Sequence, residues 1–306
     1  MGRYDRLRII ERLTPERDFE LIHRLDAQFE FPVEIAIGSE LAQIHTFAVP
    51  AIGTLLARTG EFAQRPAKRA DDTALLLTEV LAHGIVSDRG RRAVRRINRA
   101  HAPYAISQED FRYVLATFVV VAARFVDAHG WRPMSQTERT ALYLYYRHLG
   151  EHMAITDIPG SYEDMADYLD SYEARFVGYS DGGHRVALAN RDRLAADLLP
   201  RLPLRFSRAV VDALTPDHIR RALALPEPGR ATRAAVTAVL RTRAAVLRRW
   251  SAQGVDLFDD RTRGRRDEES GEPPARRSRS DSKWNRGNVS RRWSHRREYR
   301  HLPASG

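Results

Sequence analysis

Apolar residues recur at helical spacing through most of the chain, and the alternation typical of β-strands is scarce. The clearest example lies between 108 and 128, where the apolar positions are Phe111, Val114, Leu115, Phe118, Ala122, Phe125 and Val126. A spacing near 3.6 residues gathers such side chains into a stripe on one side of a helix. The sequence therefore predicts an all-α protein.

Helix starts are marked at five places. A threonine precedes a proline suited to the first helical position, or a serine stands three residues before an acidic side chain. The pairs are Thr14-Pro15, Ser107-Asp110, Ser135-Glu138, Ser161-Asp164 and Thr215-Pro216. With the apolar spacing, they predict helices over 16–29, 39–58, 67–82, 89–101, 108–128, 136–153, 162–176, 187–199, 204–213, 216–224 and 230–251.

The formal charge of +10 is unevenly distributed. Residues 261–306 contain fourteen Lys or Arg against six Asp or Glu, which leaves a net charge of only +2 on the other 260 residues. The same segment has few aliphatic residues and is rich in Arg, Ser, Gly and Pro, so it cannot bury enough apolar area to offset the entropy of ordering. We therefore expect one helical domain over 1–253 and a disordered basic tail over 254–306. The tail is expected to make at most weak contacts with anionic polymers or surfaces.

The composition excludes several classes of site. The chain has no cysteine, which excludes disulfides, cysteine nucleophiles, thiolate zinc sites and iron–sulfur clusters. The most apolar stretch, 114–123, is ten residues long, well short of the roughly 20 needed to cross a bilayer. No apolar run of signal-peptide type stands near residue 1, so we expect a cytoplasmic protein without a transmembrane segment.

Two neighbouring predicted helices carry side chains suited to a cofactor site. Arg69 and Thr73 share a helix face with core leucines, so Arg69 either points into a cavity or pairs with Asp71 or Asp72 in an exposed first turn. His101 lies one turn beyond an apolar stripe. A neutral imidazole there suits metal ligation, although a histidine at a helix end is more often structural.

Two short motifs suggest hydrolases. His148, Glu151 and His152 fit the H-x-x-E-H pattern of zinc peptidases, with Glu163 or Glu173 as a conceivable third ligand. Residues 178–182 match G-x-S-x-G, but a nucleophile elbow needs a preceding strand. We interpret 178–183 as a glycine-rich loop between helices. We keep two alternative functions: a zinc hydrolase, and a non-enzymatic helical protein that binds anionic polymers through its basic tail.

Several separated motifs follow one another along the chain: Thr59-Gly60-Glu61-Phe62, Arg69 to Thr73 (R-A-D-D-T), Arg96 to His101 (R-I-N-R-A-H), Tyr113-Val114-Leu115, Gly130-Trp131-Arg132 and Ile158-Pro159. Their order resembles that of the MpaB and latex-clearing-protein family of haem oxygenases. The resemblance is strongest over 45–180.

The resemblance implies a globin-related all-α domain that binds haem b. His101 would be the proximal iron ligand, and Arg69 and Thr73 would lie on the distal side, both binding the cofactor and assisting catalysis. Rubber-cleaving members have a lysine just before this threonine, where this chain has Asp72, so distal lysine ligation is not expected. The family chemistry is dioxygen-dependent cleavage of carbon–carbon double bonds, which implies a hydrophobic, isoprenoid-like substrate.

Overall fold

The computed structural model describes residues 2–249, and the expected tail at 254–306 lies outside this range. The described residues form helices and no strands, which confirms the predicted all-α fold for this part of the chain. In chain order the helices are α1 (Asp5–Ile10), α2 (Pro15–Leu25), η1 (Asp26–Glu30), α3 (Pro32–Phe47), α4 (Pro50–Thr59), α5 (Glu61–Gln64), α6 (Pro66–His83), α7 (Asp88–His101), α8 (Gln108–Ala116), η2 (Thr117–Val121), α9 (Ala122–His129), α10 (Gln136–His152), α11 (Tyr162–Phe176), α12 (Asp181–Leu198), α13 (Leu204–Leu214), α14 (Asp217–Ala222) and α15 (Arg230–Arg249). The elements η1 and η2 are single π-helical turns.

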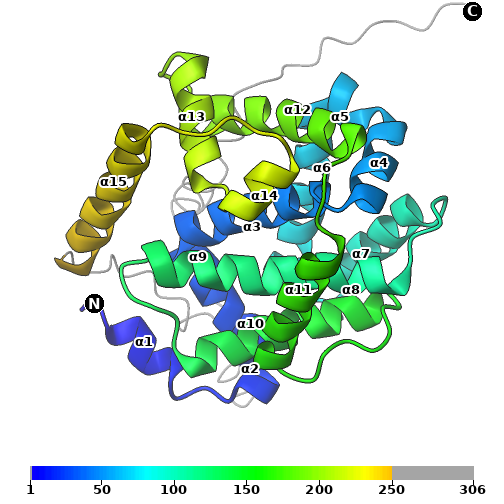
Figure 1. Cartoon of the computed structure of the whole chain (residues 1–306). Coiled ribbons are helices and arrows are strands. Elements are labelled where there is room, and N and C mark those ends of the chain that lie inside the picture. Colours follow the sequence, from blue (N-terminus) through cyan, green and yellow to red (C-terminus); the bar gives the residue numbers. More distant parts are fainter. Residues whose placement is uncertain (1, 250–306) are drawn as a thin grey trace, which may run out of the picture. The chain divides into compact units, whose positions relative to one another are not determined.

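The core is built around α3, which runs through the middle of the helices in Figure 1 and packs on α9, η2 and α12. Gly38 permits the approach of α9, because a Cβ at this position would lie 2.8 Å from the Cα of Ala122. The predicted helix over 108–128 forms α8, η2 and α9 in succession. The later part of the predicted stripe, from Ala122 to Val126, is buried, but Phe111, Val114 and Phe118 are only partly buried, and the fully buried Val119 and Val120 lie outside the stripe. The helical periodicity thus identified only part of the central packing surface.

The predicted single helix over 39–58 is wrong. The chain forms α3 and α4 instead, bent by 98° with respect to each other. Pro50 disfavours helical geometry in the residue before it, and Val49 is accordingly extended. Among the described residues no single helix has the length and apolar character to cross a bilayer, although α3 and α4 taken together pass the same criteria.

The segment 178–183 was expected to be a loop throughout, but α12 already begins at Asp181. Ser180 caps this helix by accepting a hydrogen bond from the Gly183 amide. Gly183 packs so closely on the end of α3 that a Cβ would lie 2.3 Å from the carbonyl oxygen of Phe47. Here glycine serves close helix packing, which is why reading it as a helix breaker failed.

The serine caps are as predicted, and Ser135 with Glu138 forms a complete capping box at α10. Thr14 and Pro15 open α2 as expected, although the Thr14 hydroxyl makes no capping bond. Thr215 does not cap α14, because its hydroxyl donates back to the carbonyl of Val211.

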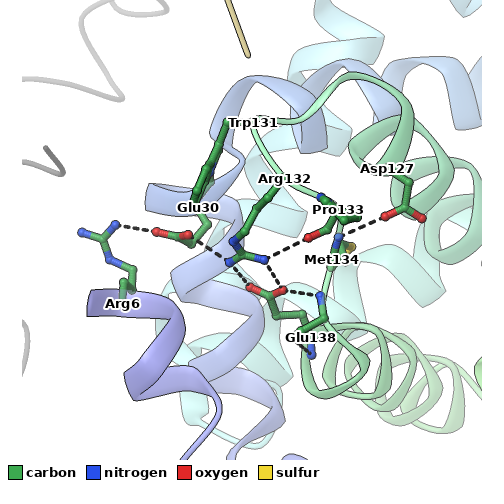
Figure 2. A network of polar contacts seen from close by, with 9 residues as sticks. Arg6, Glu30, Asp127, Trp131, Arg132, Pro133, Met134 and Glu138 are labelled. Atoms are coloured by element: carbon green, nitrogen blue, oxygen red, sulfur yellow. Dashed lines mark hydrogen bonds and ion pairs between the residues drawn. The ribbon is translucent and has the colours of Figure 1, made fainter. Parts of the chain in front are cut away.

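A buried ion cluster joins α1, η1 and α10. Arg132 donates to both oxygens of Glu138, at 2.7 and 2.6 Å, and to Glu30 at 3.0 Å. Arg6 donates to the other oxygen of Glu30 at 2.8 Å, as Figure 2 shows. Both glutamate side chains are fully buried. This Arg132 cluster therefore ties the N-terminal helices to the start of α10.

Asp26 lies beside Glu138 of the Arg132 cluster and is fully buried, and within residues 2–249 no donor lies in hydrogen-bonding geometry to either of its carboxyl oxygens. Burial, together with the neighbouring carboxylate of Glu138, raises the pKa of Asp26 well above its usual value. Folding therefore favours the protonated form of Asp26.

Candidate functional site

The three residues singled out from the sequence lie on α6 and α7, which pack against each other. Pro66 opens α6 at the position where its missing amide hydrogen costs least. Ser87 caps α7 by accepting from the Gly90 amide, and His101 is the last residue of that helix. Local sequence signals thus fix both helices that carry the candidate residues.

His101 has one ring nitrogen engaged and the other available. Its Nδ1 lies 2.9 Å from the carbonyl oxygen of Ile97. Because a carbonyl only accepts, this nitrogen carries the proton and the lone pair is on Nε2. Burial lowers the pKa of His101, the bond to Ile97 opposes this, and the positive charge of Arg69 lowers it further. The ring is therefore a neutral imidazole, the form that ligates metals.

Arg69 bonds to Thr73 rather than to an acidic neighbour. Its guanidinium donates to the Thr73 hydroxyl and lies 5.4 Å above the ring of Phe62. Burial is the largest effect on Arg69 and lowers its pKa. Asp72 instead pairs with Lys68 on the exposed side of the helix. Within residues 2–249, no ion pair joins Arg69 to Asp71 or Asp72, and that Arg69 points into a cofactor cavity stays a prediction.

The structure therefore brings Arg69, Thr73 and His101 into one neighbourhood. Phe62 lies under the guanidinium, and Phe111 meets the imidazole edge-on at 5.5 Å. A ligand nitrogen, a cationic donor and a hydroxyl between aromatic rings are the groups expected around a haem, where donors near iron tune its chemistry. The donor set fits the cofactor that the resemblance implied.

A large cavity lies elsewhere, and none of these three residues lines it. It has a volume of about 960 Å³ and is bounded by α3, α9, α11 and residues 214–222. Its walls are mainly apolar and include Leu41, Val121, Phe125, Ala174 and Leu214. A mainly apolar cavity with a few convergent polar groups is the usual form of a ligand site.

The polar groups of this cavity centre on Glu173 of α11. His45 of α3 places Nδ1 at 2.6 Å from one carboxylate oxygen, and His218 of α14 places Nε2 at 2.8 Å from the other. The buried Tyr113 hydroxyl donates to the same oxygen as His45, at 3.1 Å. We call these four residues the Glu173 cluster. Burial would raise the pKa of Glu173, but the hydrogen bonds from His218 and His45 outweigh it and lower this pKa to about 2.

The residues of the zinc-peptidase motif do not converge. His148 reaches Glu151 at 3.3 Å, but the Nδ1 of His152 is occupied by the carbonyl of His148. Within residues 2–249, the group of His, Asp or Glu side chains close enough together to hold a metal ion is His45, Glu173 and His218. The structure does not support the zinc hydrolase built on His148, Glu151 and His152.

His45 and His218 were missed by reasoning from the sequence. They are 128 and 45 residues from Glu173, so no local spacing links them. Glu173 was considered only as a third ligand for the H-x-x-E-H motif. The one local signal is that His45 follows Leu41 by four residues, which places it on the buried face of α3.

Comparison with known proteins identifies the family. Residues 34–249 match the family described as "ER-bound oxygenase mpaB/B'/Rubber oxygenase, catalytic domain". The ER-bound oxygenase mpaB' of Penicillium brevicompactum is 30% identical over 261 residues, which cover 77% of this chain and 60% of that protein. The ER-bound oxygenase mpaB of Penicillium roqueforti (strain FM164) is 29% identical over 237 residues, 69% of this chain and 76% of that protein. The mpaB of Penicillium brevicompactum is 33% identical over 183 residues, which cover 54% of this chain and 46% of that protein.

The chain thus spans less than two thirds of the length of two of these three relatives. The matched range contains Arg69, Thr73 and His101, and it covers well over half of the chain. The resemblance found in separated sequence motifs is confirmed, together with the prediction of an oxidoreductase family. The chain belongs to the mpaB and rubber oxygenase catalytic-domain family.

Proposed function

We propose that this chain is a haem b-dependent oxygenase that uses dioxygen on a hydrophobic, isoprenoid-like substrate and cleaves a carbon–carbon double bond oxidatively. The observation that carries the proposal is the placement of His101, whose Nδ1 faces the carbonyl of Ile97 so that Nε2 is left for a ligand, next to Arg69 and Thr73. Membership of an oxygenase family supports the reaction class.

In this proposal the Nε2 of His101 would hold the haem iron. The carbonyl of Ile97 fixes the ring's tautomer and orientation, as the outer partners of metal-ligating histidines do. Haem, when bound, supplies the redox chemistry with dioxygen.

Arg69 and Thr73 would be the polar donors of the haem site. The hydroxyl of Thr73 accepts from the guanidinium of Arg69, so the two side chains position each other. A partly buried cation stabilises negative charge that develops on oxygen more strongly than an exposed one would. The aromatic ring of Phe62 restricts the guanidinium on one side.

The absorption spectrum of protein purified from a haem-supplied host tests the assignment. We expect a Soret band that is lost in His101→Ala and retained in the matched control His83→Ala, at the exposed end of α6. Arg69→Ala is expected to keep the haem and to change its reactivity with dioxygen. A wild-type protein without a Soret band, or a band unaffected by His101→Ala, would refute the proposal.

The cytoplasmic location expected from the sequence is also part of the proposal. The description "ER-bound" belongs to the fungal relatives by name. Fractionation of cells expressing the full chain checks this point, and recovery in the membrane fraction would contradict it.

A further inference from the structure

The Glu173 cluster has no part in the function proposed above. It lies on α3, α8, α11 and α14, whereas the candidate haem residues lie on α6 and α7. His45 and Tyr113 are buried, and the side chain of His218 is 51% exposed beside the cavity. The cluster therefore combines a shielded interior with one accessible ligand.

We propose that His45, Glu173 and His218 form a second cofactor site, which binds one divalent transition-metal ion at the wall of the cavity. Two imidazole nitrogens and one carboxylate oxygen are the protein ligands of many zinc and non-haem iron sites. Three protein ligands leave at least one coordination position for water or for a ligand from the cavity.

The spacing of the donor atoms suits such an ion. One ligand atom from each residue can be chosen so that all three lie within 4.8 Å of one another. The histidine contacts of 2.6 and 2.8 Å are made to different oxygens of Glu173, so the carboxylate lies between the two imidazoles. Metal–ligand bonds of about 2.0–2.2 Å place neighbouring donors roughly 3–3.5 Å apart, so the side chains need only small movements to surround one ion. The two imidazole rings are nearly perpendicular, at 79° with centroids 5.9 Å apart, so they are directed at the carboxylate rather than stacked on each other.

Metal binding requires a lone pair on each of the two nitrogens that face Glu173. In the hydrogen-bonded state the Nδ1 of His45 and the Nε2 of His218 donate their protons to Glu173. When the metal binds, each of these protons moves to the other nitrogen of its ring or is released to water. The Nε2 of His45 can take such a proton, since it has no hydrogen-bond partner within residues 2–249.

Tyr113 provides the outer contact that a ligating carboxylate needs. Its hydroxyl donates to Glu173 at 3.1 Å, or alternatively to the backbone carbonyl of His45 at 3.2 Å. Such outer contacts orient a ligand before the metal arrives. The ring of Tyr172 stacks on Tyr113 at 4.3 Å and restricts its movement.

Metal titration of the full-length protein, after treatment with a chelator, tests the proposal. The probes are Co²⁺, followed by its visible absorption bands, and Zn²⁺, followed by calorimetry. We expect one equivalent to bind, and His218→Ala to weaken binding more than about 100-fold. His218 suits this test because its partly exposed side chain can be removed without leaving a cavity in the core.

His129→Ala is the matched control, because His129 lines the same cavity outside the cluster. The double variant His148→Ala/His152→Ala removes the other histidine pair, and His101→Ala removes the candidate haem ligand. All three are expected to keep the Co²⁺ site. No binding by the wild-type protein, or undiminished binding by His218→Ala, would overturn the proposal, as would loss of binding in the double variant.

Discussion

The Arg132 cluster and the Glu173 cluster both bury carboxylates, yet their partners differ in kind. Glu138 and Glu30 face the guanidiniums of Arg132 and Arg6, which stay charged at every pH that the fold survives. Glu173 faces two imidazoles and a phenol, whose protons can leave, and it lines a cavity of about 960 Å³.

The difference indicates which cluster is a scaffold and which is suited to a ligand. Arg132 makes bonds in fixed directions to carboxylates that are fully buried, so nothing can replace it without leaving a charge unpaired. In the Glu173 cluster a metal ion can replace two protons and keep every ligand satisfied. The following substitutions test this distinction.

Removing the arginine at the centre of the first cluster is expected to have the largest effect. Arg132→Met leaves Glu138 without its bidentate partner and Glu30 with Arg6 alone. An uncompensated buried charge costs about 3–5 kcal/mol, and we expect that loss in the free energy of unfolding, measured with urea. Arg139→Met, which removes a pair with Asp127 in which the side chains are 22% and 28% exposed, is the control. Equal losses in the two variants would mean that burial is not the decisive factor.

Removing one hydrogen-bond donor from the Glu173 cluster is expected to lower the free energy of unfolding by a smaller amount. Tyr113→Phe deletes the hydroxyl that bonds to Glu173, while both histidines remain. A hydrogen bond to a charged group contributes about 1.5–3 kcal/mol, and we expect a loss in that range. Tyr168→Phe removes a bond to the uncharged carbonyl of Glu109 and should cost about 1 kcal/mol. A smaller loss for Tyr113→Phe than for this control would contradict the account.

Local sequence signals predicted most of the fold. The capping box at Ser135 and the serine caps at 107 and 161 mark helix starts by hydrogen bonds within four residues. The errors arose where tertiary packing overrides local preference. Gly182 and Gly183 lie within a helix because only glycine leaves room there for the close approach of α4 and the end of α3. No local sequence signal reveals such a neighbour.

The same limit applies to the candidate sites. Arg69 and Thr73 are one turn apart, and His101 ends the next long helix, so their shared neighbourhood could be inferred from two adjacent helices and a family resemblance. The Glu173 cluster draws on α3, α8, α11 and α14, which meet only in the folded chain. The H-x-x-E-H motif shows the converse, because residues adjacent in sequence fail to converge.

Asp26 allows the Arg132 cluster to be tested through pH. The pKa of Asp26 is higher in the folded chain than in the unfolded chain. The stabilisation linked to this shift is therefore fully present below the unfolded pKa, and it is lost as pH rises through the folded pKa. Asp26→Asn mimics the protonated form at every pH. We expect the variant to be more stable than the wild type at pH 7, by a margin that shrinks as pH falls toward 4. Urea unfolding at several pH values measures the difference, and a margin that does not change with pH would refute the raised pKa of Asp26.

The smallest loss in the free energy of unfolding is expected at the rim of the cavity. An ion pair there has the bidentate geometry of the Arg132 cluster but is exposed to water. Arg124 donates to both oxygens of Asp170 at 2.7 Å, a bidentate pair like that of Arg132 with Glu138. The side chains are 49% and 56% exposed, so water screens the pair and solvates either partner when the other is removed. Arg124→Ala is therefore expected to lower the free energy of unfolding by about 0.2–1 kcal/mol and to leave Co²⁺ binding at the Glu173 cluster unchanged. A loss as large as that of Arg132→Met would mean that bidentate geometry, rather than burial of the carboxylate, holds the Arg132 cluster together.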